Sequence, residues 1–207
     1  MAGVGIQLSF GNIMQLMGIL SPLILSAFLV ISSISNGNLK WIMYLAGMII
    51  LVVLFTIITF TIDMKYESGS SGLTSGVCHF IQMPFGLSEY SAPSFNSTIL
   101  GFIFAYLFMP MVQNNNYNIV FLCIIGSLFL IDAVTKIRFG CTPIVGVLLG
   151  GFFGYIVGYL WYSFMVMSGN NSLLFFNEGS NTQICSRPNK QTFKCAVFRN
   201  GEIIKNL

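Results

Sequence analysis

The chain contains 207 residues, of which 55% are hydrophobic and only 7% are charged. A soluble domain carries about 25% charged residues, so this composition excludes a soluble enzyme, a disordered chain and a coiled coil. The formal net charge of +3 at pH 7 is too small to indicate a nucleic-acid partner. The composition therefore predicts a membrane protein.

Five segments are long and apolar enough to form transmembrane helices, which need about 20 mostly apolar residues. They cover approximately residues 12–33, 41–62, 97–112, 117–134 and 143–167. The third segment is short and contains Pro110. We therefore expect an all-α polytopic membrane protein, in which residues 1–167 form a bundle of five transmembrane helices.

Residues 168–207 have a different character and predict a polar C-terminal tail. Residues 168–171 are typical of a linker, and residues 191–198 partly alternate polar and apolar side chains. Asn200-Gly201 is a strong turn signal, after which residues 202–204 can return as a partner strand. Because a lone hairpin is only marginally stable in water, we expect it to dock on the bundle or on a partner protein.

The basic residues predict the orientation of the chain. With five spans, the N-terminal side of the membrane holds Lys65, Lys136 and Arg138. The other side holds the remaining six, which are Lys40, Arg187, Lys190, Lys194, Arg199 and Lys205. Since cytoplasmic segments carry the excess of Lys and Arg, the tail is expected on the cytoplasmic side.

The five cysteines and the single histidine show no metal-ligand spacing. We therefore expect no metal and no cofactor. Cys185 and Cys195 could form a disulfide across a hairpin or remain reduced.

Glycine recurs at every fourth position of the fifth span, at Gly146, Gly150, Gly154 and Gly158. This spacing creates a flat groove along one helix face, where another backbone can approach closely. The groove could serve homodimerisation or packing inside the same bundle. Because four other spans are available to fill it, we favour packing inside the bundle.

Asp132 lies near the end of the fourth span, four residues before Lys136. An acid at membrane depth suggests a functional role. However, an i,i+4 ion pair at a helix end can reach solvent, and we expect this pair to be solvated. A proton relay is disfavoured because the spans contain no histidine.

Two polar segments, residues 88–98 and 135–142, are expected on the same side of the membrane. Helix N-terminal amides together with Lys136 and Arg138 could form an anion site there. The simpler interpretation, which we favour, is a pair of solvated loops.

Residues 90–160 resemble the type 2 phosphatidic acid phosphatases. Their second motif, PSGH, is similar to Pro93-Ser94-Phe95-Asn96. Their third motif, SRxxxGxHxxxD, which often continues VxxG, is matched in part by Thr135, Lys136, Gly140, Thr142, Gly146, Val147 and Gly150.

The departures from these motifs bear on activity. In the family, one His is the phosphate nucleophile, an Asp orients it, and a second His is the general acid. The positions that match them hold Thr142, Gly146 and Asn96. Because a phosphohistidine mechanism needs an imidazole nucleophile, the resemblance implies a pseudoenzyme without hydrolase activity. The residues that could still hold a lipid phosphate are Ser94, Asn96, Lys136, Arg138 and Thr142.

The plan of the whole chain is similar to that of small membrane proteins of large double-stranded DNA virus particles. The chain is short, multi-span and rich in Asn, Ile and Phe, and its tail reads Cys-x-x-Pro-x-Lys-Gln-x-Phe-Lys-Cys from Cys185 to Cys195. This resemblance implies a virion inner membrane, a host-derived internal membrane during assembly, and capsid or minor capsid proteins as partners.

Two functions follow as expectations. The first is a structural virion membrane protein that anchors the inner membrane to the capsid shell through Arg187, Lys190, Lys194 and Arg199. The alternative is a pseudo-phosphatase that binds a lipid phosphate. A transporter is disfavoured because no inverted repeat is evident. We favour the structural role, with membrane lipids and shell proteins as partners and no enzymatic activity.

Overall fold

The computed structural model describes residues 10–63, 90–138, 140–176, 196–199 and 202–206. Its five long helices have the length and composition of transmembrane helices, which confirms the predicted all-α polytopic fold. They are α1 (Phe10–Ser35), α2 (Lys40–Ile62), α3 (Phe95–Gln113), α4 (Ile119–Arg138) and α5 (Ile144–Met167). The chain is therefore a multi-pass membrane protein.

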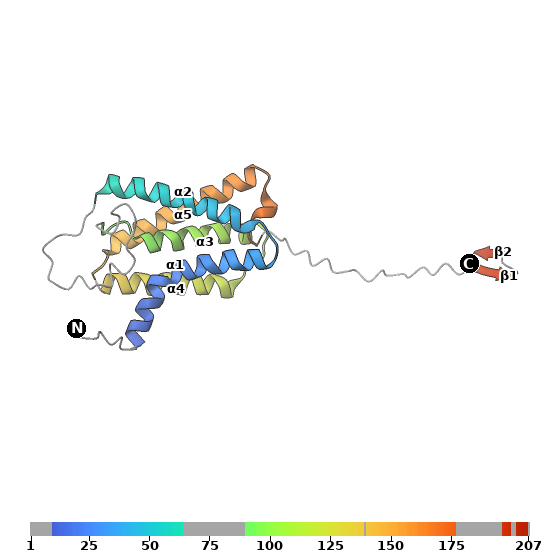
Figure 1. Cartoon of the computed structure of the whole chain (residues 1–207), viewed down its shortest axis with the longest axis horizontal. Coiled ribbons are helices and arrows are strands. Elements are labelled where there is room, and N and C mark those ends of the chain that lie inside the picture. Colours follow the sequence, from blue (N-terminus) through green and yellow to red (C-terminus); the bar gives the residue numbers. More distant parts are fainter. Residues whose placement is uncertain (1–9, 64–89, 139, 177–195, 200–201, 207) are drawn as a thin grey trace, which may run out of the picture.

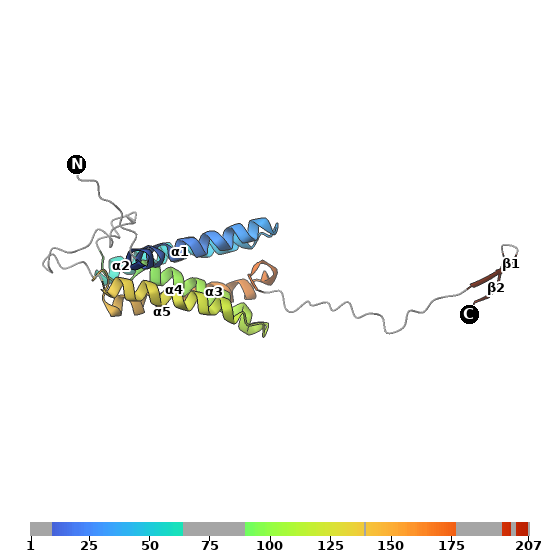
Figure 2. The ribbon, with the colours of Figure 1, turned by 90° about the horizontal axis from the view of Figure 1, so that it is seen from below.

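The helices form two layers (Figure 1 and Figure 2). Helices α1 and α2 cover a second layer, in which α3 lies between α4 and α5. Inside the bundle 67% of the α3 span is buried, against at most 33% of any other span. The short third segment of the sequence is therefore the central helix of the protein.

Helix α1 bends within its N-terminal half (Figure 1), and it contains Pro22. Proline has no N–H to donate to the carbonyl four residues earlier and its ring displaces that carbonyl, which kinks a helix. That carbonyl belongs to Gly18, and it accepts a hydrogen bond from the Ser21 hydroxyl at 2.9 Å. The serine thus satisfies a backbone group that lipid could not.

Helices α3 and α5 pack backbone against backbone. A Cβ atom added to Gly154 would lie only 1.9 Å from the carbonyl oxygen of Thr98. Equivalent close approaches join Gly150 to Ser94, Gly158 to Phe102, and Gly101 of α3 to Gly151. Gly146 faces Ala92 and the side chain of Thr142. The glycine stripe is therefore filled from within the same bundle, which is the arrangement favoured from the sequence.

Helix α4 extends one turn beyond the predicted end of the fourth span and includes Lys136 and Arg138 in its last turn. The helix ends at Arg138, and the chain then turns at Gly140, whose φ of +69° lies in the left-handed region. The Cys141 N–H donates to the Lys136 carbonyl at 2.8 Å and the Gly140 N–H to the Ile137 carbonyl at 3.1 Å, which is a Schellman ending. The prediction that residues 135–138 form a loop was therefore wrong, because no helix-breaking residue precedes Gly140.

The segment that follows α5 is held against the bundle. It contains the 3-10 helix η2 (Asn171–Leu173), and the next side chain, Leu174, is fully buried. The ring of Phe175 lies 6.4 Å from those of Tyr44 and Tyr106, and the Asn114 side chain donates to the carbonyl oxygen of Phe176 at 3.2 Å. The expected linker at residues 168–171 is thus part of a segment that packs on the bundle as far as Phe176.

Within the tail, strand β1 (Ala196–Arg199) pairs antiparallel with β2 (Glu202–Asn206). The register places Arg199 opposite Glu202 and Ala196 opposite Asn206. The predicted Asn200-Gly201 turn, and all of the tail between residues 177 and 195, lie outside the described residues.

Candidate functional site

A buried polar network connects α3 and α4 near one end of the bundle. It consists of Ser94, Asn96, Ser97, Asp132 and Lys136. Asp132 is only 1% exposed, and its carboxylate accepts hydrogen bonds from the Asn96 amide at 3.2 Å and from the Ser97 hydroxyl at 3.1 Å. The Lys136 ammonium lies 3.4 Å from the same carboxylate. Both carboxylate oxygens therefore have partners within the bundle.

Ser94 extends the network toward α5. Its hydroxyl accepts a hydrogen bond from Lys136 Nζ at 2.8 Å and is also hydrogen-bonded to the Ser97 hydroxyl at 3.0 Å. Its backbone N–H donates to the carbonyl oxygen of Gly146 at 2.9 Å. The sequence places Ser94 directly before α3, so one residue connects the start of α3 to the start of α5.

Asn96 extends the network toward α1. Its side-chain amide donates to the carbonyl oxygen of Ile19 at 3.2 Å, in addition to its bond with Asp132. The network is thus joined to the backbone of α1 through the Asn96 side chain and to the backbone of α5 through the Ser94 N–H. Because a polar group in hydrocarbon must find a partner, these bonds fix how the four helices sit against one another.

The ion pair is not solvated, contrary to the prediction for Asp132 and Lys136. The Lys136 side chain is 15% exposed and Asp132 is 1% exposed. The extra turn of α4 places Asp132 farther inside the bundle than its place in the predicted span suggested. The positive charge of Lys136 is compensated by Asp132, so the network carries no net charge that would attract an anion.

The structure brings some of the predicted lipid-phosphate residues together and separates others. Ser94, Asn96 and Lys136 share the network, whereas Thr142 is buried against Gly146 and makes no bond to the network within the described residues. Arg138 is exposed in the last turn of α4 and is likewise outside the network.

Sequence reasoning overlooked Ser97 and the structural role of Asp132. The spacing of the serines could have indicated Ser97, because Ser94 and Ser97 lie three residues apart at the start of a helix and therefore share a face. What the sequence does not contain is the pairing of that face with α4.

A small apolar pocket opens beside Asn96, between α1, α2 and α3. It encloses about 260 Å³. Its walls are mostly apolar side chains, with Ser26 and Asn96 as the two polar residues. A cavity of this kind in a membrane protein can accept part of an acyl chain.

The remaining predicted site residues belong to the C-terminal tail. Arg187, Lys190, Lys194, Cys185 and Cys195 lie outside the described residues. Arg199 is the last residue of β1.

Comparison of the chain with protein families, with curated proteins and with solved structures finds no match.

Proposed function

We propose that the protein is a structural membrane anchor that presents a basic tail to a protein shell. The observation that carries this proposal is the fixed attachment of the tail. The chain is held against the bundle as far as Phe176, through buried Leu174 and the hydrogen bond from Asn114. A pull that reaches Phe176 is therefore transmitted to the packed bundle of transmembrane helices.

The interior of the bundle suits such a role. Its buried charges, Asp132 and Lys136, neutralise each other, and the network joins four helices. The backbone contact between α3 and α5 leaves no room for a sliding motion that changes the register of the glycines. The polar network and the close contact between α3 and α5 therefore make the bundle a rigid support for the tail.

The orientation of the tail has two supports. The first is the excess of Lys and Arg on the tail side. The second is Cys141, at the opposite end of the bundle, which is disulfide-bonded. Disulfides persist in oxidising compartments and are rare in the cytosol, so Cys141 favours the non-cytoplasmic side. Both observations support the proposed cytoplasmic position of the tail.

The resemblance of the chain to small membrane proteins of large double-stranded DNA virus particles specifies the proposal further. The membrane would be the inner membrane of such a particle, formed from a host internal membrane. The tail would contact a capsid or minor capsid protein through Arg187, Lys190, Lys194 and Arg199. Basic side chains suit an acidic surface on that partner.

Neutralising these four residues together should detach the shell. Four ion pairs with the partner, at about 0.5 kcal/mol each, would contribute about 2 kcal/mol, which is roughly thirtyfold in affinity. The measurement is co-sedimentation of shell protein with membranes that contain the Arg187→Gln, Lys190→Gln, Lys194→Gln, Arg199→Gln variant. The matched control exchanges Lys and Arg at the same four positions, which keeps every charge. Equal shell recovery in both variants would refute an electrostatic contact through the tail.

The second candidate function is lipid-phosphate binding without hydrolysis, and the pocket beside Asn96 favours it. An acyl chain in that pocket would bring a headgroup to Asn96 and to its network neighbours Ser94 and Lys136. Against it stands Asp132, whose carboxylate already pairs with Lys136. Loss of anionic-lipid binding after Lys136→Ala and Arg138→Ala, with shell attachment unchanged, would support this function.

A further inference from the structure

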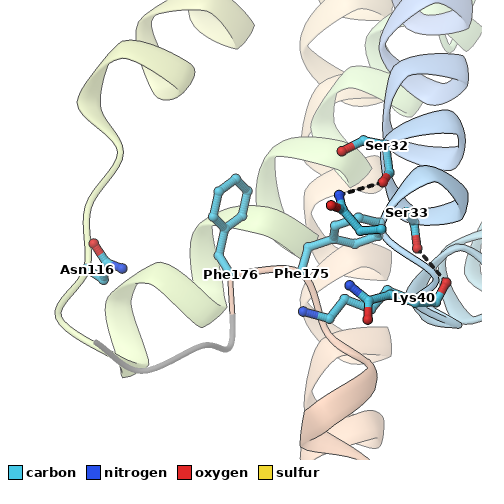
Figure 3. Close-up of a pocket in the computed structure, with 8 residues that line it drawn as sticks. Ser32, Ser33, Lys40, Asn116, Phe175 and Phe176 are labelled. Atoms are coloured by element: carbon cyan, nitrogen blue, oxygen red, sulfur yellow. Dashed lines mark hydrogen bonds between the residues drawn. The ribbon is translucent and has the colours of Figure 1, made fainter. Parts of the chain in front are cut away.

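A second pocket lies at the other end of the bundle, where the tail leaves it (Figure 3). Four chain segments surround it: the end of α1, the connection to α2 with the first residue of α2, the loop between α3 and α4, and the segment that follows η2. The lining residues are Ser32, Ser33, Asn36, Asn38, Lys40, Asn116, Phe175 and Phe176. We refer to it below as the tail-end pocket.

The tail-end pocket lies at the depth of lipid headgroups. Helices α1, α3 and α5 end at Ser35, Gln113 and Met167, while α2 and α4 begin at Lys40 and Ile119. All five transmembrane helices therefore terminate around it. In a bilayer this level is the boundary between hydrocarbon and water.

Polar side chains dominate the lining. Six of the eight lining residues are Ser, Asn or Lys, and Lys40 supplies the positive charge. The side-chain amides of Asn38 and Asn116 make no hydrogen bond within the described part of the chain. Amide N–H groups and an ammonium are the donors that bind phosphate oxygens.

The shape of the pocket is fixed by its own hydrogen bonds. The Ser33 hydroxyl donates to the Asn38 carbonyl at 3.0 Å and accepts from the Trp41 N–H at 3.1 Å. These bonds hold the connection between α1 and α2, and hence the position of Lys40. The backbone that carries Asn38 and Lys40 is therefore in place before any ligand binds.

Two aromatic rings form the apolar part of the pocket. Figure 3 shows Phe175 and Phe176 between Asn116 on one side and Ser32, Ser33 and Lys40 on the other. The ring of Phe176 lies 5.6 Å from that of Phe121, which supports it from α4. The pocket thus presents polar donors and an apolar surface to the same occupant.

We propose that the tail-end pocket binds the phosphate headgroup of an anionic phospholipid in the leaflet on the side of the tail. Its volume of about 490 Å³ lies within the range of small-molecule sites, roughly 300–1,000 Å³. Lys40 pairs with the phosphate, the amides of Asn38 and Asn116 donate to its oxygens, and the two Phe rings contact the glycerol. Basic pockets between transmembrane helices on the cytoplasmic side suit such headgroups.

Free phosphate shares the charge and the acceptor oxygens of the headgroup, but it has no apolar part to contact Phe175 and Phe176. The experiment therefore compares the two. The purified full chain in uncharged detergent micelles is titrated with 1-palmitoyl-2-oleoyl phosphatidylglycerol, and bound lipid is counted by native mass spectrometry. A second titration uses inorganic phosphate alone, and a third adds an excess of it to the lipid complex.

Lys40→Gln should weaken the tightest lipid site about tenfold, the loss expected for one charge-assisted hydrogen bond. Lys40→Arg should keep the affinity within about twofold, because it keeps the charge. Asn116→Leu should also weaken binding without removing a charge. Lys205→Gln removes one positive charge from the tail and should leave the tightest site unchanged.

Three results would overturn the proposal. The first is equal lipid affinity in the wild-type chain and in Lys40→Gln. The second is a loss confined to an Arg138→Gln variant, which would place the lipid at the other end of the bundle. The third is saturable binding of inorganic phosphate that displaces the lipid, which would make the occupant a free anion. Only variants that elute as a monodisperse species are compared, because such a species is folded. If Lys40→Gln does not meet this condition, the lipid affinity of Asn116→Leu tests the proposal instead.

Discussion

Replacement of Gly154 by Ala is expected to lower the free energy of unfolding by about 1–3 kcal/mol, the usual cost of overpacking a dense core. A Cβ atom at this position would lie 1.9 Å from the carbonyl oxygen of Thr98. That atom is backbone in the most buried helix, so it cannot rotate away. Helices α3 and α5 must separate to admit the methyl group. The measurement is denaturation of the purified chain in detergent micelles.

The matched control is Gly126→Ala in α4, where an added Cβ atom meets nothing within 4 Å. Ala is favoured over Gly in a helix by roughly 0.5–1 kcal/mol, so this variant should be as stable as the original or slightly more so. Equal destabilisation by both substitutions would show that helix propensity, rather than contact with α3, sets the effect. The importance assigned to the glycine stripe would then be wrong.

Replacement of Asp132 by Asn is expected to cost about 3 kcal/mol, the lower end of the range for breaking a buried ion pair. The substitution leaves the Lys136 ammonium without its counter-charge. We take the lower end because Lys136 retains 15% exposure and keeps its bond to Ser94. The free energy of unfolding in detergent micelles measures this loss.

The double variant Asp132→Asn, Lys136→Met removes both charges and should recover part of the loss. In a double-mutant cycle the effects of the two substitutions on the free energy of unfolding should therefore be far from additive, since the residues are in direct contact. Additive losses would mean that the two charges do not depend on each other. The description of the network as a closed structural unit would then fail.

The sequence predicted the number and the approximate extent of the transmembrane helices, because hydropathy reports directly on length in the membrane. It did not predict that α3 is the central helix. Lipid and the interior of a bundle are equally apolar, so hydropathy does not separate a buried helix from an exposed one. The difference lies in small and polar residues such as Ser97, Thr98 and Gly101, which allow close contact with α5.

The candidate site was predicted in composition but not in arrangement. Ser94, Asn96 and Lys136 were identified from the sequence, yet Asp132 was expected to be solvated and Ser97 was overlooked. The error for Asp132 came from placing the end of α4 at residue 134 instead of Arg138. The tail-end pocket could not be predicted, since three parts of the chain that are distant in sequence must meet before it exists.

The measurement that tests the anchoring role most directly is lysine cross-linking with mass spectrometry on the native membrane or the intact particle. The informative residues are the three tail lysines, Lys190, Lys194 and Lys205. The account predicts repeated links from these lysines to one abundant shell protein on the cytoplasmic side. A tail that forms no protein links, in preparations where shell proteins link to one another, would contradict it.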